Sequence, residues 1–399
     1  MNKKQFLAVG VDAGSVYTRC VIACLENSRL RFLGYGVADS HGWTKSRITD
    51  QQSVSECITR AVQRAESMAQ VSVENVTAGF GGLTVRGANT RSRLELGRPR
   101  ELEQRDINRA LERAVRVQLQ EDRMVLQLFP QDFAIDDHPG HSDPRTMLGS
   151  HLQANAHLIT VSTQEHNALV GAVNQAHLAA DETVFEALAA SYAAVLPEDR
   201  RDGIAVIDIG AHSTDLVVYY GDALQLASSL PICGDHFTRD IAHFLRISYE
   251  DAAVIKDEYG SAVADSTALN SLIELPVRSH RDPREIPRRQ VNEILEARAL
   301  ELFKLVRREL ARVGMERSLG SGVVLTGGAA KLHAMCDAAE NALDCQAHIG
   351  LPGGLLHWPE ELDDPSWCTA TGLAMYSARL HTHSDLDRQS VGVLARILR

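Results

Sequence analysis

Residues 6–15 read Phe-Leu-Ala-Val-Gly-Val-Asp-Ala-Gly-Ser, an apolar run that ends in an Asp-x-Gly turn. Residues 204–211, Ile-Ala-Val-Ile-Asp-Ile-Gly-Ala, repeat this design. The second aspartate, Asp208, follows the first, Asp12, by 196 positions (208 − 12), which is about half of the 399-residue chain. The sequence therefore predicts two copies of one structural unit.

Each turn leads into further apolar runs. Residues 20–24 and 216–220 form the second run of each copy, and a third run begins after the polar breaks at 27–28 and 221–222. Both copies predict strand, turn, strand, turn, strand, and hence two similar lobes that face each other. The plain structural alternative is a pair of unrelated hairpins whose turns happen to contain glycine.

The two turns favour a phosphate site. Glycine has no Cβ atom, so it lets backbone N–H groups approach a phosphate closely. An ionised aspartate at a strand end only accepts hydrogen bonds, which suits a hydrated Mg²⁺ beside phosphates. The candidate residues are Asp12, Gly14, Ser15 and Val16 in the first copy, and Asp208, Gly210, Ala211, His212, Ser213 and Asp215 in the second.

Three further segments fit a cleft between lobes. Residues 321–326 predict a strand, and the glycines at 327–328 precede a helical pattern that runs to Leu343, so a ligand can lie against that backbone. Residues 184–196 and 368–376 are rich in Ala and Gly and predict two helices that pack closely, as a hinge requires. Ordinary helix packing explains either helix equally well when each is taken alone.

These segments resemble, in type and order, the two phosphate loops, the adenosine motif and the two connecting helices of the actin and sugar-kinase ATPase superfamily. Over most of its length the sequence is similar to the FtsA family of bacterial cell-division proteins. The stretches that carry this resemblance are residues 97–102, 128–136, 143–149, 185–196, 206–210, 230–242 and 324–332.

The resemblance implies an α/β, actin-like, duplicated two-lobe ATPase fold with an FtsA-type inserted subdomain. It also implies ATP and Mg²⁺ in the cleft, with Asp12 and Asp208 holding the hydrated ion. Glu186 matches the position that orients attacking water in the superfamily, although an acid at a helix start is also favoured by the helix dipole. Further nucleotide contacts would come from Gly234, Lys256, Gly327 and Gly328.

The second phosphate loop departs from the family pattern. Ala211 and His212 stand where FtsA relatives usually have glycines, and a non-glycine residue at positive φ would cost roughly 1–2 kcal/mol. His212 either donates a hydrogen bond to a terminal phosphate or fills the phosphate site. The first loop has Tyr17 and Thr18 where many relatives carry a basic residue, and Cys233 replaces a second glycine before Gly234. We expect retained ATP binding with slow or absent hydrolysis.

Residues 84–159 would form the inserted subdomain. Its apolar residues after Pro99 fall at helical spacing and predict one buried stripe, made of Ile107, Ala110, Leu111, Ala114 and Val115. Many arginines surround this stripe. A solvated basic face is one interpretation of them. The resemblance implies contacts with a neighbouring protomer and other division proteins.

Residues 278–308 concentrate positive charge in an acidic chain. This stretch holds nine Lys or Arg and five acids, a balance of +4, and then becomes an amphipathic helix. Arginine binds carboxylates bidentately, so the stretch suits an acidic peptide. The resemblance implies the C-terminal tail of FtsZ, and a solvated face is the alternative. The candidate contacts are Arg288, Arg289, Asn292 and Arg298.

The C-terminus predicts a membrane contact. Residues 381–390 are polar and favour a linker, and residues 391–399 form a short amphipathic pattern with Val391, Leu394 and Leu398 on one face. Such a helix is too short to be stable in water, but a membrane can bury its apolar face. The resemblance implies this use, and docking on the protein's own surface is the alternative.

Composition excludes other classes. The net charge of −11 (41 Lys and Arg against 52 Asp and Glu) argues against a nucleic-acid partner. The seven cysteines form no CxxC pair, and Cys20 and Cys24 favour core positions over a metal site. No secretory signal or spanning stretch is apparent. We expect a peripheral protein on the cytoplasmic face of the membrane.

The resemblance implies a protein that binds ATP, polymerises and tethers FtsZ filaments to the membrane at the division site with other division proteins. A pilus-assembly actin homologue and a sugar or metabolite kinase are the alternatives. The expected division of the chain is a first lobe at 1–83, 160–200 and 368–380, an insertion at 84–159, a second lobe at 201–235 and 318–367, a partner-binding subdomain at 236–317, a linker at 381–390 and a tip at 391–399.

Overall fold

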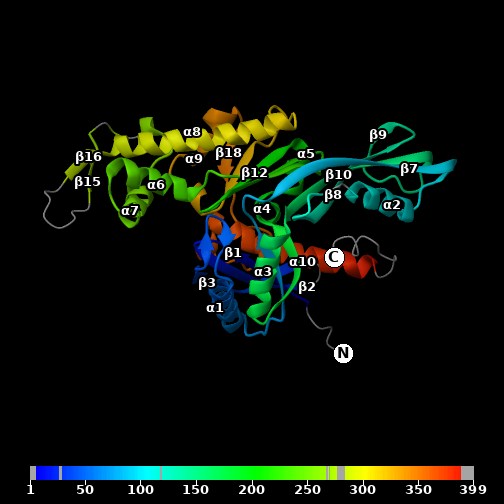
Figure 1. Ribbon diagram of the computed structural model, residues 1–399, viewed down its shortest axis with the longest axis horizontal. Coiled ribbons are helices and arrows are strands. Elements are labelled where there is room, and N and C mark those ends of the chain that lie inside the picture. The colour runs from blue at the N-terminus through cyan, green and yellow to red at the C-terminus, as the bar shows by residue number, and fades with distance from the viewer. Residues whose placement is uncertain are drawn as a thin grey trace.

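The structure, a computed structural model, describes residues 6–26, 29–116, 119–266, 268, 270–275 and 284–387. Figure 1 shows one lobe below and a wider second lobe above it, with extensions at both ends of the upper lobe. A sheet of six strands lies in the lower lobe, and a sheet of nine strands runs through the upper lobe into one extension.

The first sheet has the order β11-β6-β1-β2-β3-β19. The strands β1, β2 and β3 are consecutive antiparallel neighbours, and β6 and β11 continue the sheet in parallel on the β1 side. The bounds are β1 Phe6–Ala13, β2 Tyr17–Glu26, β3 Arg29–Asp39, β6 Asn75–Phe80, β11 Ala179–Phe185 and β19 Leu355–Leu356.

The second sheet repeats this plan. Its strands β12, β13 and β14 are again consecutive antiparallel neighbours, and β17 and β18 continue it in parallel on the β12 side. The predicted duplication of strand, turn, strand, turn, strand is therefore confirmed. The bounds are β12 Ile204–Ile209, β13 Thr214–Tyr220, β14 Ala223–Leu230, β17 Val323–Thr326 and β18 Ala347–Ile349.

Helices cover both faces of the first sheet. The helices α1 (Gln51–Ala69) and α3 (Thr163–Gln175) pack on one face, where the buried side chains of β1 and β2 include Cys20. The helices α4 (Glu186–Ala194) and α10 (Cys368–Asp387) pack against each other on the other side. A Cβ atom on Gly372 would lie 1.8 Å from the carbonyl oxygen of Ala189. The predicted close packing of these two helices is confirmed, but residues 184–185 end strand β11 rather than begin a helix.

The inserted segment extends the second sheet. Its strands β7 (Arg86–Glu101), β10 (Leu148–Ser162), β8 (Arg123–Ile135) and β9 (His138–His141) continue from β14 in that order. The helix α2 (Gln104–Val115) covers them and shares a separate apolar core with them. The predicted stripe on this helix is confirmed, since Ile107, Ala110, Leu111 and Ala114 are buried and Val115 packs against them.

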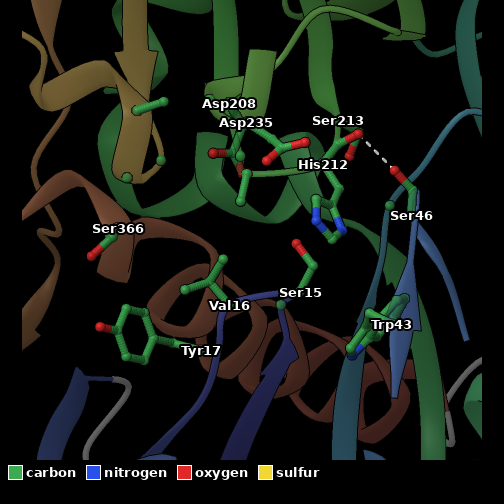
Figure 2. A pocket seen from close by; sticks show the side chains of 18 of the residues that line it. Ser15, Val16, Tyr17, Trp43, Ser46, Asp208, His212, Ser213, Asp235 and Ser366 are labelled. Carbon is green, nitrogen blue, oxygen red and sulfur yellow. Dashed lines mark hydrogen bonds between the residues drawn. The ribbon is translucent and has the colours of Figure 1, made fainter. Parts of the chain in front are cut away.

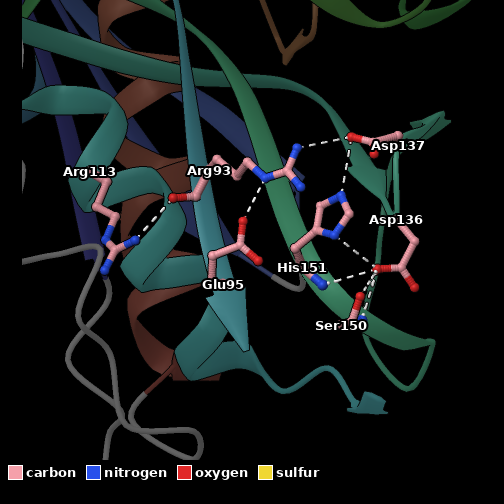
Figure 3. Close-up of polar contacts among 7 residues, drawn as sticks. All are labelled: Arg93, Glu95, Arg113, Asp136, Asp137, Ser150 and His151. Atoms are coloured by element: carbon pink, nitrogen blue, oxygen red, sulfur yellow. Dashed lines mark hydrogen bonds and ion pairs between the residues drawn. The ribbon is translucent and has the colours of Figure 1, made fainter. Parts of the chain in front are cut away.

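Polar contacts fix the turn between β8 and β9 (Figure 3). Asp136 and Asp137 both have positive φ, and Asp136 Oδ1 accepts hydrogen bonds from the backbone N–H groups of Ser150 and His151. The nearly buried imidazole of His151 lies between the two carboxylates, and Arg93 pairs with Asp137 at 3.1 Å. These contacts hold the pKa values of both aspartates below their ordinary range, with hydrogen bonding as the main cause.

The other end of the upper lobe carries mainly helices. They are α6 (Gly234–Leu245), α7 (Tyr249–Tyr259), the long α8 (Arg288–Arg312) and α9 (Met335–Leu343), with the short hairpin β15 (Leu272–Leu275) and β16 (Arg284–Pro287). The helix predicted directly after the glycines at 327–328 is wrong in its start, because a 3₁₀ turn at Gly328–Lys331 comes first. The remaining elements are α5 (Pro197–Asp202), the hairpin β4 (Trp43–Thr44) and β5 (Arg47–Ile48), and 3₁₀ turns at Ala264–Ser266, Glu360–Leu362 and Pro365–Trp367.

The last described helix runs further than expected. Because α10 continues to Asp387, the predicted linker at 381–390 is wrong for residues 381–387. The predicted tip at 391–399 lies outside the described residues. None of the helices in the described part of the chain combines the length and apolarity needed to span a bilayer.

Candidate functional site

A cavity of about 890 Å³ opens between the two lobes, and both duplicated turns line it (Figure 2). Every residue predicted to contact nucleotide or Mg²⁺ lines it except Asp215, which lies just behind, near Gly81. The residues brought together are Asp12, Gly14, Ser15, Val16, Glu186, Asp208, Gly210, Ala211, His212, Ser213, Gly234, Lys256, Gly327 and Gly328.

The first turn joins β1 to β2 below the cavity. Gly14 is required there, because a Cβ atom on it would lie 2.7 Å from the carbonyl oxygen of Tyr17. The basic residue that the loop itself lacks is supplied from the next strand. Arg19 lines the cavity, donates to Ser366 Oγ at 3.1 Å and lies over the ring of Trp367. The alternation of side chains along β2 could have predicted that Arg19 lies on the same face as Tyr17. It could not have predicted the contact with Ser366, which is distant in the sequence.

The second turn is closed by backbone contacts. Gly210 N–H donates to Ser213 O at 3.0 Å, and Gly234 N–H, at the start of α6, donates to Gly210 O at 2.9 Å. Neither Ala211 nor His212 has positive φ, so the conformational penalty considered for them does not arise. The imidazole of His212 points into the cavity (Figure 2), and burial lowers its pKa, so it is neutral at pH 7.

The glycines at 327–328 complete the cavity wall. Gly327 has φ of +84°, and a Cβ atom on it would lie 2.4 Å from Asp208 Oδ1. Its N–H donates to Pro365 O at 3.1 Å, which connects this turn to the segment that leads into α10. This wall therefore accepts only glycine at 327, because the turn packs directly against Asp208 and the backbone of Ile209.

Four carboxyl groups gather behind the phosphate turns. Burial raises the pKa of Asp12 to about 7 and of Asp215 to about 8, and the nearby Asp208 adds repulsion in both cases. Burial, followed by repulsion from the three aspartates, raises the pKa of Glu186 well above its usual range. Burial also raises the pKa of Asp208, although Thr369 Oγ1 donates to it at 2.8 Å. Such a cluster favours a cation or retained protons.

The donor chemistry fits a hydrated Mg²⁺. Carboxylate oxygens are preferred Mg²⁺ ligands, and Mg²⁺ usually keeps several waters and binds one or two carboxylates beside phosphates. Among the described residues no three His, Cys, Asp or Glu side chains are grouped to hold a metal directly. Asp12 and Asp208, which both line the cavity, are the carboxylates that would hold such a hydrated ion.

The predicted partner residues separate in the structure. Arg288 lines the cavity and donates from Nε to Tyr259 O at 2.7 Å, and Asn292 is fully buried and accepts from Ser261 N–H. A surface contact through the Asn292 side chain is thus wrong. Arg289 reaches the surface beside Asp265 and Glu293, and Arg298 forms a half-buried pair with Asp240.

Several cavity residues were not predicted. Besides Arg19, they include Trp43 and Ser46 from the β4–β5 hairpin, Gly81 and Gly82 after β6, and Glu165 at the start of α3. Ser46 Oγ donates to His212 O at 2.7 Å, a contact between residues 166 positions apart. No local pattern announces contacts of this range. The glycines at 81–82 after an apolar run were the one available signal.

Comparisons with solved structures identify the fold as actin-like. A chain of the PilM–PilN type IV pilus biogenesis complex aligns with a TM-score of 0.68 at 16% identity, covering 93% of this chain and 98% of that one. MreB5 of Spiroplasma citri bound to ADP aligns with a TM-score of 0.56 at 13% identity, covering 96% and 98%. The MamK double helical filament gives 0.55 at 12% identity, covering 93% and 98%.

Sequence comparisons identify the family. The model for cell division protein FtsA matches residues 205–372, and the model for the SHS2 domain inserted in FtsA matches residues 82–160. Cell division protein FtsA of Pseudomonas aeruginosa is 30% identical, covering 97% of this chain and 91% of that protein. FtsA of Escherichia coli K12 is 29% identical, covering 96% and 92%. The chain therefore belongs to the FtsA family of cell division proteins.

Proposed function

We propose that this protein binds ATP with Mg²⁺, assembles into filaments and tethers FtsZ filaments to the cytoplasmic face of the membrane at the division site. The observation that carries the proposal is the cavity, which joins both duplicated turns and the glycines at 327–328 in a chain of the FtsA family. The MreB5 of Spiroplasma citri, which shares the fold, was solved with ADP and with AMPPNP.

Different parts of the cavity would bind different parts of the nucleotide. The backbone turns at Gly14–Ser15 and Gly210–Ser213 would bind phosphates, while the wall of Gly327, Lys256 and Arg288 would take adenosine. The bound Mg²⁺ would neutralise phosphate charge. Burial and the three neighbouring aspartates raise the pKa of Glu186, which would make it a poorer base for orienting water than a freely ionised carboxylate. Slow or absent hydrolysis follows.

The exposed side of α8 would hold the acidic tail of FtsZ. Arg289 is the best placed of the predicted arginines, because it is partly exposed and its two acid partners are more exposed still. An incoming carboxylate can replace those partners, since exposed ion pairs contribute little, about 0–1 kcal/mol. Arg298 instead pairs with Asp240, so we expect it to position α6 against α8.

Reversing the charge at Arg289 should weaken binding of the FtsZ tail. The Arg289→Glu variant places a carboxylate where the acidic peptide must dock, and we expect at least about tenfold weaker binding, ~1.4 kcal/mol. Fluorescence anisotropy with a labelled FtsZ tail peptide measures this. Arg312→Glu is the matched control, because Arg312 lies on the same helix and is also paired with an acid, Glu309. Equal losses in both variants would refute the placement.

Tethering has its own test. The full chain, FtsZ polymers and vesicles containing anionic lipid should sediment together, and omission of ATP should reduce the FtsZ recovered with the vesicles. The reason is that ATP would hold the two lobes in one arrangement and so favour filament contacts. A chain that ends at residue 384 should leave FtsZ in the supernatant. Equal recovery with both chains would contradict membrane tethering through the C-terminus.

The pilus-assembly alternative rests on the PilM–PilN likeness, which shows the fold alone at 16% identity. The FtsA proposal is favoured because the model for the SHS2 domain inserted in FtsA matches residues 82–160. A metabolite kinase would release ADP only when an acceptor is present, so an ADP-release assay with and without candidate acceptors separates it from the FtsA proposal.

A further inference from the structure

A small hairpin closes one end of the cavity. Strands β4 and β5 pair Trp43 with Ile48 and Thr44 with Arg47. The two residues between them, Lys45 and Ser46, have φ values of 48° and 65°, as in a tight two-residue turn of the mirror-image type. This backbone places Ser46 at the tip of the hairpin.

Contacts hold the hairpin across the cleft. At its tip, Ser46 Oγ donates to His212 O, in the second phosphate turn, at 2.7 Å. Next to the tip, Arg47 pairs with Glu165, at the start of α3 in the first lobe, at 2.9 Å. The hairpin therefore spans from the first lobe to the turn of the second lobe that would bind phosphate.

Two polar atoms of residues that line the cavity beside this hairpin are buried without a hydrogen-bond partner among the described residues. Trp43 lines the cavity, and its Nε1 atom is buried without a hydrogen-bond acceptor among the described residues. His212 Nδ1 is likewise buried without a partner in the described part of the chain. An indole N–H can only donate, and a buried donor requires an acceptor. The cavity therefore lacks an acceptor at this place that a ligand oxygen would supply.

The position along the cavity indicates which oxygen this is. Ser46 packs beside Gly82, and the neighbouring Gly81 lies against the carboxyl groups of Glu186 and Asp215. Figure 2 shows Trp43, Ser46 and His212 on one side of the cavity and Ser366, which adjoins the Gly327 wall, on the opposite side. A nucleotide with its base at that wall and its phosphates on the two turns directs its last phosphate toward the hairpin.

We propose that Trp43 Nε1, on the hairpin that Ser46 holds to His212, donates to the terminal phosphate of a nucleoside triphosphate, so that the cavity prefers triphosphate to diphosphate. This inference rests on the ATP binding proposed above. The neutral donors matter there because the four buried carboxyl groups would otherwise repel the last phosphate. A diphosphate, which is one phosphate shorter, would leave this donor unsatisfied.

Isothermal titration with Mg²⁺ tests the preference. The full chain is titrated with ADP and with a non-hydrolysable ATP analogue, and we expect the analogue to bind more tightly. Trp43→Phe keeps an aromatic ring but removes the N–H. It should weaken binding of the analogue about tenfold or more, the loss typical of a hydrogen bond to a charged group, and leave ADP binding within about twofold. Ser46→Ala, which frees the hairpin tip, should act in the same direction.

Trp358→Phe is the matched control. Its Nε1 atom is also buried without a partner, but Trp358 does not line the cavity, so neither affinity should change. If Trp43→Phe folds poorly, the wild-type chain with ¹⁵N-labelled indoles answers the question, because the analogue and not ADP should shift one of three tryptophan N–H resonances.

The outcomes separate two failures. If the wild-type chain binds neither nucleotide, both the ATP proposal and this inference are wrong. If it binds both, and Trp43→Phe weakens them equally or not at all, ATP binding stands and the phosphate role of Trp43 is overturned.

Discussion

Replacing Gly372 with alanine should destabilise the protein strongly. In most helices this change is favourable by about 1 kcal/mol. Here the added Cβ atom would lie 1.8 Å from the backbone oxygen of Ala189 in α4, and backbone cannot move aside as a side chain can. We expect a loss of about 3 kcal/mol, at the upper end for overpacking, and a fall in Tm of about 4 °C in a thermal melt.

Gly171→Ala provides the matched control for this prediction. Gly171 also lies inside a helix, α3, and its new Cβ atom would meet the side-chain amide of Gln51, which can rotate away. This variant should be neutral or slightly more stable. Equal destabilisation of both variants would show that loss of glycine, rather than the contact between α4 and α10, matters. Gly372→Ala should also weaken nucleotide binding, because displacement of the two helices would move residues of the cavity. Glu186 is the first residue of α4, and Thr369 of α10 donates a hydrogen bond to Asp208.

Stability of the nucleotide-free protein should fall as pH rises from 6.5 to 8.5. The pKa values of Asp12 and Asp215 are raised by burial to about 7 and about 8, so the folded state retains protons that the unfolded state has already lost above pH 4–5. The folded state then binds more protons, and the free energy of unfolding decreases with pH, by about 1.4 kcal/mol per pH unit for each proton. His157, His166 and His212, whose pKa values are lowered by burial, oppose this slope up to about pH 7.5, because the unfolded chain still binds part of their protons there, so the fall is steepest above that pH.

Thermal melts across this pH range measure the effect. Asp215→Asn is neutral at every pH and should reduce the slope, with its largest gain in Tm at pH 8.5. Asp222→Asn is a surface control, since Asp222 is half exposed and paired with Arg201, and it should keep the wild-type slope. Mg²⁺ with ATP should flatten the curve, because the ion favours the ionised carboxylates. A wild-type Tm that rises over this range would contradict the proton-retaining cluster.

The sequence contained enough to predict the fold and most of the cavity. The duplicated turns are local, so Asp12, Gly14, Asp208 and Gly210 could be placed at strand ends from the apolar runs alone. Their convergence followed from the repetition, because two copies of one lobe that face each other bring equivalent turns together. The small residues of α4 and α10 likewise predicted a close contact that Gly372 makes possible.

The errors concern boundaries and long-range contacts. Asn292 has the polar character of a surface contact, but it is buried because its side chain bonds the backbone at Ser261. The role of Ser46 depends on a residue 166 positions away. No propensity or periodicity describes such a pairing, since only the packed lobes create it. Polar composition after residue 380 indicated a linker, yet α10 continues, since that helix carries few strong helix breakers.

The length of α10 sets a direction as well as a distance. A helix advances 1.5 Å and turns by about 100° with each residue. The helix is continuous from Cys368 to Asp387, so the number of residues in it determines on which side of the helix axis its last residue lies. Inserting or deleting one residue in α10 would rotate the position of its last residue about the helix axis by about 100°. Inserting seven residues would return that position almost to its original side, because seven residues make nearly two full turns. The effect of an insertion or deletion in this helix should therefore depend on the rotation that it causes about the helix axis more than on the number of residues that it adds or removes.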